Sequence, residues 1–199
     1  MKQHYEAFSK NDANYVPLSP LSFIIRTADL FPERVAIIYG DRRYSWAESY
    51  ARMRQLASAL DGAGLGIGDT VSVIAANTPE MFEAHYGVPM AGCVLNTINT
   101  RLEAETIAYI LDNSDCRLLI VDTAFHETVV AAMASLDLVV RDRIKVIDIR
   151  DPLAGEMPHI GDQDYEAFIA TGDPAYDWQM PADEWQALAL GYTSGTSGR

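Results

Sequence analysis

The residues best suited to chemistry lie in one stretch, 192–198, near the end of the 199-residue sequence. This stretch holds four Ser or Thr hydroxyls and two glycines, namely Thr193, Ser194, Gly195, Thr196, Ser197 and Gly198. It follows an apolar run, 187–190, that is typical of a strand. A strand that opens into such a loop can present backbone N–H groups and hydroxyls to a phosphate, because glycine lets the backbone approach closely. This favours a phosphate-binding role for these six residues, although the same composition also suits a flexible linker.

Other kinds of active site fit the sequence poorly. Ser194 is one residue too far from Gly191 for the G-x-S-x-G pattern of a serine hydrolase, and no histidine follows it. The stretch also lacks the G-x-x-x-x-G-K pattern of a P-loop NTPase. Four histidines are scattered without metal-ligand spacing, which favours surface or packing roles: His4, His85, His126 and His159. We assign no catalytic residue to these 199 residues, and the metal ligands are unknown.

The two cysteines, Cys93 and Cys116, each adjoin an apolar run. This position favours small buried hydrophobic side chains over a disulfide or a metal site.

The composition is that of an ordinary globular protein, with 49% hydrophobic and 22% charged residues. A formal charge of −13 disfavours nucleic acid as a partner, since nucleic-acid binding depends mostly on phosphate neutralisation. The N-terminus has no signal-peptide core, and no apolar stretch approaches the roughly 18 residues that span a bilayer. We expect a soluble, cytoplasmic protein with no membrane span.

The beginning of the chain predicts a leader, a helix and a hairpin. Residues 1–20 are polar and include two prolines, which predicts an irregular leader. The stretch 21–31 has the spacing of a helix that ends before Pro32. The expected buried anchors of this helix are Phe23, Ile24, Leu30 and Phe31. Two short strands, 35–39 and 43–46, are predicted to form a β-hairpin.

The next helix lies between a capping box and a glycine run. Ser45 and Glu48 have the spacing at which each satisfies the other's backbone N–H. The helix should bury one face, made of Tyr50, Met53, Leu56, Ala57 and Leu60. The glycine run 62–68 invites a dinucleotide-binding interpretation, but that fingerprint needs a strand before the glycines and a helix after them. Here a helix precedes and a strand, 71–76, follows, which predicts a helix end and a turn.

Strands and helices then alternate along the chain. Pro79 should stand in the first turn of a helix whose buried side holds Phe82, Tyr86 and Met90. Thr100 and Glu103 predict a second capping box, before a helix that buries Ile107, Ile110 and Leu111. The other expected elements are strands over 93–95, 116–121 and 144–149 and helices over 129–136 and 164–170. Such alternation implies parallel strands and right-handed crossovers. The predicted fold class is α/β, with a doubly wound, mostly parallel sheet flanked by helices.

The stretch 192–198, with the sequence Tyr-Thr-Ser-Gly-Thr-Ser-Gly, resembles the pyrophosphate-binding loop of the adenylate-forming superfamily, usually written YTSGTTG-x-PKG. Six of the seven residues match, and Ser197 keeps the hydroxyl of the commoner Thr. Upstream, residues 92–102 resemble the family's GA-V-x-x-x-LNTRL segment, 41–46 its early hairpin and 68–71 its GD-x-V segment. The likeness covers residues 20–199 and is greatest to acyl-CoA synthetases for short- and medium-chain acids.

This resemblance implies a two-step, AMP-forming ligase. A carboxylic acid and Mg²⁺-bound ATP would give an acyl-adenylate and pyrophosphate, and coenzyme A would then displace AMP to form a thioester. The loop residues would hold the β- and γ-phosphates. Members of the family are much longer, so residues 21–199 would be the first part of the large N-terminal AMP-binding domain of an acyl-CoA synthetase, inactive alone. A homodimer is a further expectation.

Two other classes stay open on these residues. Another adenylate-forming ligase, such as an aryl-acid ligase or a carrier-protein adenylation domain, would carry the same loop. A non-catalytic α/β nucleotide-binding module would share the fold without turnover.

Overall fold

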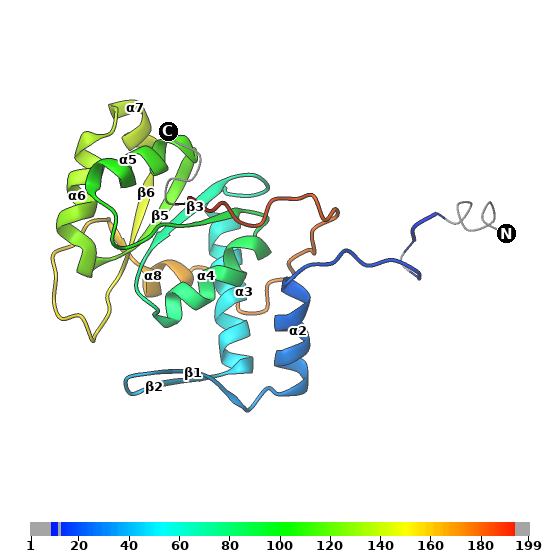
Figure 1. Ribbon diagram of the computed structural model, residues 1–199. Coiled ribbons are helices and arrows are strands. Elements are labelled where there is room, and N and C mark those ends of the chain that lie inside the picture. Colours follow the sequence, from blue (N-terminus) through cyan, green and yellow to red (C-terminus); the bar gives the residue numbers. More distant parts are fainter. Residues whose placement is uncertain (1–8, 12, 194–199) are drawn as a thin grey trace.

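The computed structural model of the protein describes residues 9–11 and 13–193, which form an α/β fold (Figure 1). The strands are β1 (Val35–Tyr39), β2 (Arg42–Ser45), β3 (Thr70–Ile74), β4 (Val94–Thr97), β5 (Cys116–Asp122), β6 (Lys145–Ile149) and β7 (Gln163–Asp164). The helices are α2 (Leu21–Leu30), α3 (Trp46–Gly62), α4 (Pro79–Met90), α5 (Ala104–Asn113), α6 (His126–Ser135), α7 (Leu138–Arg143) and α8 (Tyr165–Ile169), with a short 3-10 helix η1 (Thr123–Phe125). The described residues before Leu21 form no helix or strand.

Strands β3 to β7 form one parallel sheet in the order β4-β3-β5-β6-β7. The chain passes from β3 outward to β4 and then crosses back to the other side of β3, where β5 lies. This reversal confirms the doubly wound prediction. It also makes the carboxyl ends of β3 and β5 the topological switch point, which is where open α/β sheets bind ligands. The predicted hairpin is confirmed as the separate antiparallel pair β1–β2.

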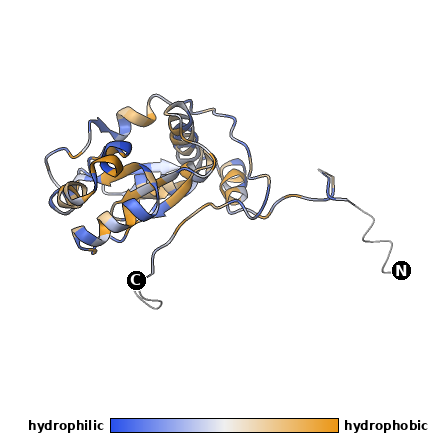
Figure 2. Ribbon diagram, turned by 90° about the horizontal axis from the view of Figure 1, so that it is seen from above, coloured by the Kyte–Doolittle hydropathy of each residue, from blue (hydrophilic) through white to orange (hydrophobic). Residues whose placement is uncertain are grey.

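The sheet is buried on both faces, as the apolar sequence of β5 predicted. Leu118 and Ile120 point into a core cluster that they share with α3, α4 and α8. Leu119 and Val121 point the other way, into a second core cluster shared with α5 and α6. Seen from above, the strands are largely orange and lie between helices that have both orange and blue sides (Figure 2). Alternate side chains of β5 therefore pack against the helices on the two opposite faces of the sheet.

The local sequence predicted both ends of α3 correctly. Ser45 Oγ accepts the N–H of Glu48 at 3.2 Å, and Glu48 Oε2 accepts the N–H of Ser45 at 2.7 Å, so the capping box forms. At the other end, Gly64 and Gly68 adopt positive φ angles of 83° and 88° in the turn before β3. A helix thus precedes the glycine run and a strand follows it, which excludes the dinucleotide fingerprint there.

The predicted anchors of α2 were wrong except for Ile24. Phe23 and Leu30 are 60% and 54% exposed, and Phe31 lies beyond the helix. The buried residues are Leu21, Ile24 and Ala28. Helix α2 packs against α3 and α4 along this single stripe, so its other apolar side chains stay outside the core.

The second capping box was also wrong. Helix α5 begins at Ala104, and Glu103 makes no side-chain cap. Asn99 Oδ1 instead accepts the N–H of Arg101 at 3.0 Å. This hydrogen bond holds Thr100 in a turn and moves the helix start along the chain.

The prediction for the buried side of α4 is confirmed for Met90, which lies in the core, but not for the other two residues. Phe82 and Tyr86 are half-buried, whereas Glu83, Ala84 and Gly87 face the core. At Gly87, helix α4 approaches α3 closely, since a Cβ added there would lie 2.8 Å from Leu56 Cδ2 of α3. An apolar pattern could not identify this side because it includes a carboxylate.

The later elements were predicted in type more accurately than in number. The strand 144–149 and the short helix 164–170 are confirmed as β6 and α8. The region 129–143 holds two helices where one was expected, because α7 has no buried residue and therefore no apolar stripe. The two-residue strand β7 was not predicted. In the described part of the chain, no helix is both long enough and apolar enough to cross a membrane.

Candidate functional site

The segment that leads to the predicted phosphate loop lies beside β4. Leu95 N donates to Leu188 O at 3.0 Å, and Leu190 N donates to Leu95 O at 2.8 Å. The bridge between Leu95 and Ala189 is parallel. The apolar run 187–190 therefore extends the parallel sheet at its β4 edge, by a single bridge, and runs in the same direction as the strands.

Thr193 is the predicted phosphate-binding residue that the structure describes, and its side chain is exposed. Tyr192, just before it, is half-buried, and Tyr192 Oη donates to Asn113 Oδ1 at 2.7 Å. The other predicted residues lie outside the described part of the chain: Ser194, Gly195, Thr196, Ser197 and Gly198. Their role in binding phosphate stays a prediction.

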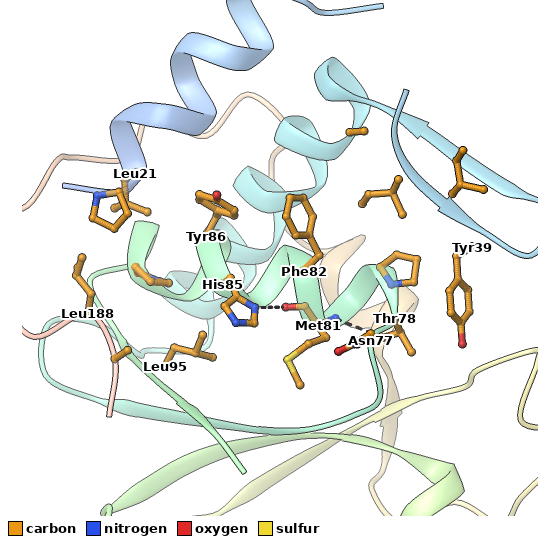
Figure 3. Close-up of a pocket in the computed structure, with 17 residues that line it drawn as sticks. Leu21, Tyr39, Asn77, Thr78, Met81, Phe82, His85, Tyr86, Leu95 and Leu188 are labelled. Carbon is orange, nitrogen blue, oxygen red and sulfur yellow. Dashed lines mark hydrogen bonds between the residues drawn. The ribbon is translucent and has the colours of Figure 1, made fainter. Parts of the chain in front are cut away.

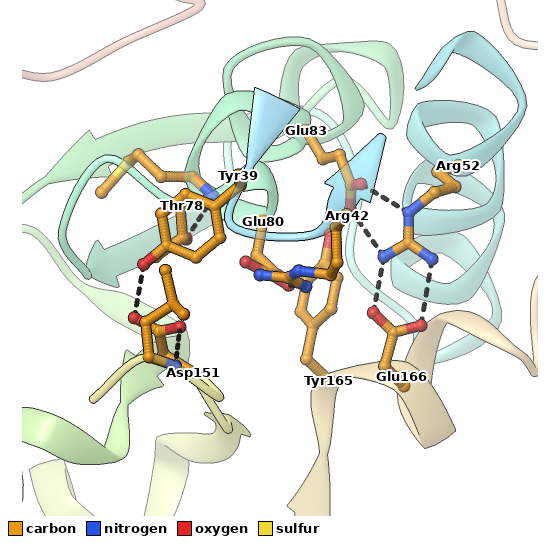
Figure 4. A network of polar contacts seen from close by, with 11 residues as sticks. Tyr39, Arg42, Arg52, Thr78, Glu80, Glu83, Asp151, Tyr165 and Glu166 are labelled. Atoms are coloured by element: carbon orange, nitrogen blue, oxygen red, sulfur yellow. Dashed lines mark hydrogen bonds and ion pairs between the residues drawn. The ribbon is translucent and has the colours of Figure 1, made fainter. Parts of the chain in front are cut away.

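Polar side chains gather at the carboxyl ends of the central strands. Asp122 ends β5 and is buried, and Asp151 follows β6. Tyr39 Oη donates to Asp151 Oδ2 at 2.5 Å, so the hairpin is fastened to this edge of the sheet (Figure 4). Burial and this hydrogen bond raise the pKa of Tyr39 to about 12. Burial also raises the pKa of Asp122, and the nearby carboxylates of Asp151 and Glu80 act in the same direction.

An ionic cluster of Arg52, Glu83, Tyr165 and Glu166 joins α3, α4 and α8 (Figure 4). Arg52 Nε pairs with Glu83 Oε1 at 2.5 Å, and the Arg52 Nη atoms bind both oxygens of Glu166 at 2.6 and 3.0 Å. Tyr165 Oη donates to Glu83 Oε2 at 2.8 Å. Burial opposes the charge on Arg52, but the two carboxylates outweigh it and raise the pKa of the guanidinium. The cluster fastens three helices to one another over one face of the sheet.

A second pair fastens the hairpin to α4. Arg42 Nη1 lies 2.7 Å from Glu80 Oε1, and the Glu80 side chain is almost fully buried in the first turn of α4. An acidic residue suits that position because the helix N-terminus carries partial positive charge. Sequence reasoning missed all of these buried charges, since nothing in the residue types distinguishes a buried Glu from a surface one.

An open, mainly apolar groove of about 670 Å³ lies between α2, β1 and α4. In Figure 3, Met81, Phe82 and Tyr86 project from α4, and Leu95 and Leu188 lie together at one end. Its polar lining groups are Tyr39, Asn77, Thr78, His85 and Tyr86. No Lys, Arg, Asp or Glu lines it among the described residues, so the groove offers no charged partner for a phosphate.

Cys93 and Cys116 are free and buried, which confirms the predicted packing role. Burial raises the pKa of Cys93 to about 12. Within residues 9–11 and 13–193, no group of three or more His, Cys, Asp or Glu side chains is placed to hold a metal ion.

Fold and site together define a class of protein. It is a doubly wound α/β domain whose parallel sheet is extended by a segment that precedes a stretch of sequence rich in Gly, Ser and Thr. The family model for AMP-binding enzymes matches residues 24–199, and the chain belongs to this family.

Known relatives of the chain are CoA ligases. It is 44% identical over 196 residues to an acetate–CoA ligase of Humulus lupulus and, over the same length, to a peroxisomal acetate/butyrate–CoA ligase of Arabidopsis thaliana. Each match covers 94% of this chain and 34% of the relative, so the chain spans about a third of the length of these proteins. The crystal structure of an anthranilate CoA ligase with anthranoyl-AMP has the same fold, with a TM-score of 0.77 at 20% identity, over 96% of this chain and 35% of that one.

Proposed function

We propose that the protein is the first part of an AMP-forming acyl-CoA synthetase, a carboxylic acid–CoA ligase. The observation that carries the proposal is the AMP-binding family match over residues 24–199, which includes the hydroxyl-rich loop. The 44% identity to two CoA ligases supports the choice of thiol acceptor. The proposed co-substrates are ATP and coenzyme A.

The proposed reaction has two steps. A carboxylate oxygen of the acid attacks the α-phosphorus of ATP, the bond between the α-phosphorus and the bridging oxygen breaks, and pyrophosphate leaves. The thiol sulfur of coenzyme A then attacks the acyl carbonyl carbon, the thiol proton passes to solvent, and AMP leaves with the electrons of the acyl–oxygen bond. The products are the thioester, AMP and pyrophosphate.

The residues of this chain would act on the leaving group. Thr193, Ser194, Thr196 and Ser197 would donate hydroxyl hydrogen bonds to the β- and γ-phosphates, and the glycines would let backbone N–H groups approach. The exposed Thr193, directly after the sheet extension, fits this donor set. Mg²⁺, held mainly by the phosphates themselves, would neutralise part of their charge.

We further propose a short-chain acid as the substrate, because the two relatives at 44% identity are named for acetate and butyrate. Adenylation rates of the full-length protein with acetate, butyrate and benzoate would test this. A preference for benzoate would favour the aryl-acid alternative. A cytoplasmic location and a homodimer also stay predictions, and one of the two relatives is named as peroxisomal.

The role of the loop can be tested by comparing the two half-reactions in the full-length protein. We expect Thr193→Ala and Thr196→Ala to slow ATP–pyrophosphate exchange by about 10- to 100-fold, because each removes a donor to a charged group. Transfer of the acyl group from preformed acyl-AMP to coenzyme A should change much less. An equal loss in both half-reactions would contradict the assigned role.

A further inference from the structure

Two contacts hold the chain just before the proposed phosphate loop, and they come from different elements. The first is the backbone pairing of Leu188 and Leu190 with Leu95 of β4, at 3.0 and 2.8 Å. The second is the hydrogen bond from Tyr192 Oη to Asn113 Oδ1, at 2.7 Å, on the last residue of α5. The tyrosine ring also packs against the core cluster shared by α5 and α6.

The second contact is made to helix α5, which is anchored in the core. Helix α5 buries Ile107, Ile110 and Leu111 in that cluster. After Asn113 the helix closes through Ser114, whose N–H donates to Ile110 O at 2.9 Å. Arg143 then ties the same end to Asp112 and Asp115, at 3.6 and 3.0 Å. The helix end that carries Asn113 is therefore anchored, and the exposed Asn113 side chain offers its amide oxygen Oδ1 to the Tyr192 hydroxyl from there.

Gly191 lies between the two contacts. An added Cβ there would meet no atom within 4 Å, so no neighbouring side chain restricts this residue. Glycine has the widest backbone freedom of all residues. Without the bond at Tyr192, only the packing of its ring would hold the chain beyond Leu190, and rotation at Gly191 would shift Thr193 more easily.

We propose that Asn113 is a positioning residue, which fixes the place of Thr193, the first of the proposed phosphate-binding residues, by accepting the hydroxyl of Tyr192. This inference rests on the proposed function, because it assigns Thr193 and the following residues to ATP phosphates. Burial raises the pKa of Tyr192, so its phenol is a neutral donor at physiological pH. In this proposal Tyr192 and Asn113 bind no substrate themselves and act through the position of Thr193.

The test uses the full-length enzyme, with ATP–pyrophosphate exchange as the assay. Tyr192→Phe keeps the packed ring and removes only the hydroxyl, and Asn113→Ala removes the acceptor. We expect each variant to raise the KM for ATP about three- to tenfold, the range for loss of one hydrogen bond, while the KM for the acid and the melting temperature stay as in the wild type. The double variant should be no worse than either single variant, because both remove the same bond.

Two controls separate positioning from structure. Asn113→Asp retains an acceptor oxygen, so this variant should have the same KM for ATP as the wild type. Glu105→Gln changes an exposed side chain on the same helix and should leave both KM values unchanged. Unchanged KM values for ATP in Tyr192→Phe and Asn113→Ala, or additive effects in the double variant, would overturn the inference.

Failure of this inference is distinguishable from failure of the proposed function. If Thr193→Ala slows exchange while Tyr192→Phe and Asn113→Ala do not, the loop binds phosphate and the positioning role is wrong. If the wild-type full-length enzyme shows no exchange with any acid, the proposed function itself is wrong.

Discussion

At the scale of single residues, burial decides the chemistry of the reactive side chains. Cys93 and Cys116 are completely buried, and Tyr39 is held against Asp151. Removal from water disfavours the ionised form of a thiol or a phenol, and this raises the pKa of all three groups. None of them is prepared as a nucleophile. The reactive bonds of the proposed mechanism belong to the substrates, and the protein contributes hydrogen-bond donors.

The thiols should resist alkylation in the folded protein. The thiolate is the reactive form, and burial raises the pKa of Cys93 to about 12. We expect iodoacetamide to leave Cys93 and Cys116 unmodified between pH 7 and 9 and to modify both after unfolding in urea, as measured by mass spectrometry. Because the folded pKa lies above the unfolded one, the neutral thiol contributes stability that is present below about pH 8.5 and is lost as pH rises towards 12. Rapid modification of the folded protein at pH 8 would contradict the buried placement.

At the scale of elements, the helices over one face are joined by buried charge as well as by apolar packing. The Arg52 guanidinium lies between Glu83 of α4 and Glu166 of α8. The two pairs differ in exposure, since the Glu83 side chain is 0% exposed and that of Glu166 is 61% exposed. Breaking a buried pair leaves an uncompensated charge, whereas an exposed pair is screened by water. The two carboxylates should therefore contribute very differently to stability.

Glu83→Ala should lower the free energy of unfolding by about 3–5 kcal/mol, because it breaks the buried pair with Arg52 and removes the acceptor of Tyr165. Glu166→Ala should lower it by less than about 1 kcal/mol. Urea unfolding followed by circular dichroism measures both. Equal losses from the two variants would show that the depth of the pair does not matter.

Two glycines form a second matched pair: Gly172 packs against α3, and Gly62 is the last residue of that helix. An added Cβ at Gly172 would overlap with the carbonyl oxygen of Gln55 in α3, whereas a Cβ at Gly62 would meet nothing within 4 Å. We expect Gly172→Ala to destabilise the protein by about 1–3 kcal/mol through overpacking. Gly62→Ala should stabilise it by about 0.4–1 kcal/mol through lower unfolded-state entropy. Thermal unfolding of both variants tests the close approach at Gly172. An unchanged melting temperature in Gly172→Ala would refute it.

At the scale of the whole molecule, the described chain carries the parallel sheet and the segment that precedes the hydroxyl-rich stretch 192–198. It spans about a third of the length of its relatives. Its groove is open and mainly apolar, without a charged lining group in the described part, and its net charge of −13 does not attract an anionic nucleotide. Phosphoryl chemistry depends on positioning and charge stabilisation, and the described lining of the groove supplies no charged group for it.

A polypeptide of residues 1–199 should therefore form no acyl-CoA. We expect no hydroxamate from acetate, ATP and hydroxylamine, and no heat of ATP binding by calorimetry, under conditions where the full-length enzyme gives both. Circular dichroism of the same preparation would verify that it is folded. Thioester formation by the 199-residue polypeptide would contradict this expectation.

The sequence by itself determined the fold class, most element positions and the family. The pattern of apolar residues specifies which face of a strand or helix is buried, and this identified β5 and the inward side of α5. Capping and turn residues act within a few positions of the chain, so the start of α3 and the glycine turn were also predictable. The family was recognisable because its motif in the stretch 192–198 consists of particular residue types in a fixed order.

Only the tertiary structure decided which polar residues are buried and what they contact. Arg52, Glu83 and Glu166 are far apart in sequence, and their pairing depends on how α3, α4 and α8 pack. The same holds for Tyr192 and Asn113, which are brought together when the final segment pairs with β4. Local patterns carry no information about such distant pairs. The hydroxyl-rich loop was thus evident from the sequence, whereas the two contacts that hold its base became visible only in the folded chain.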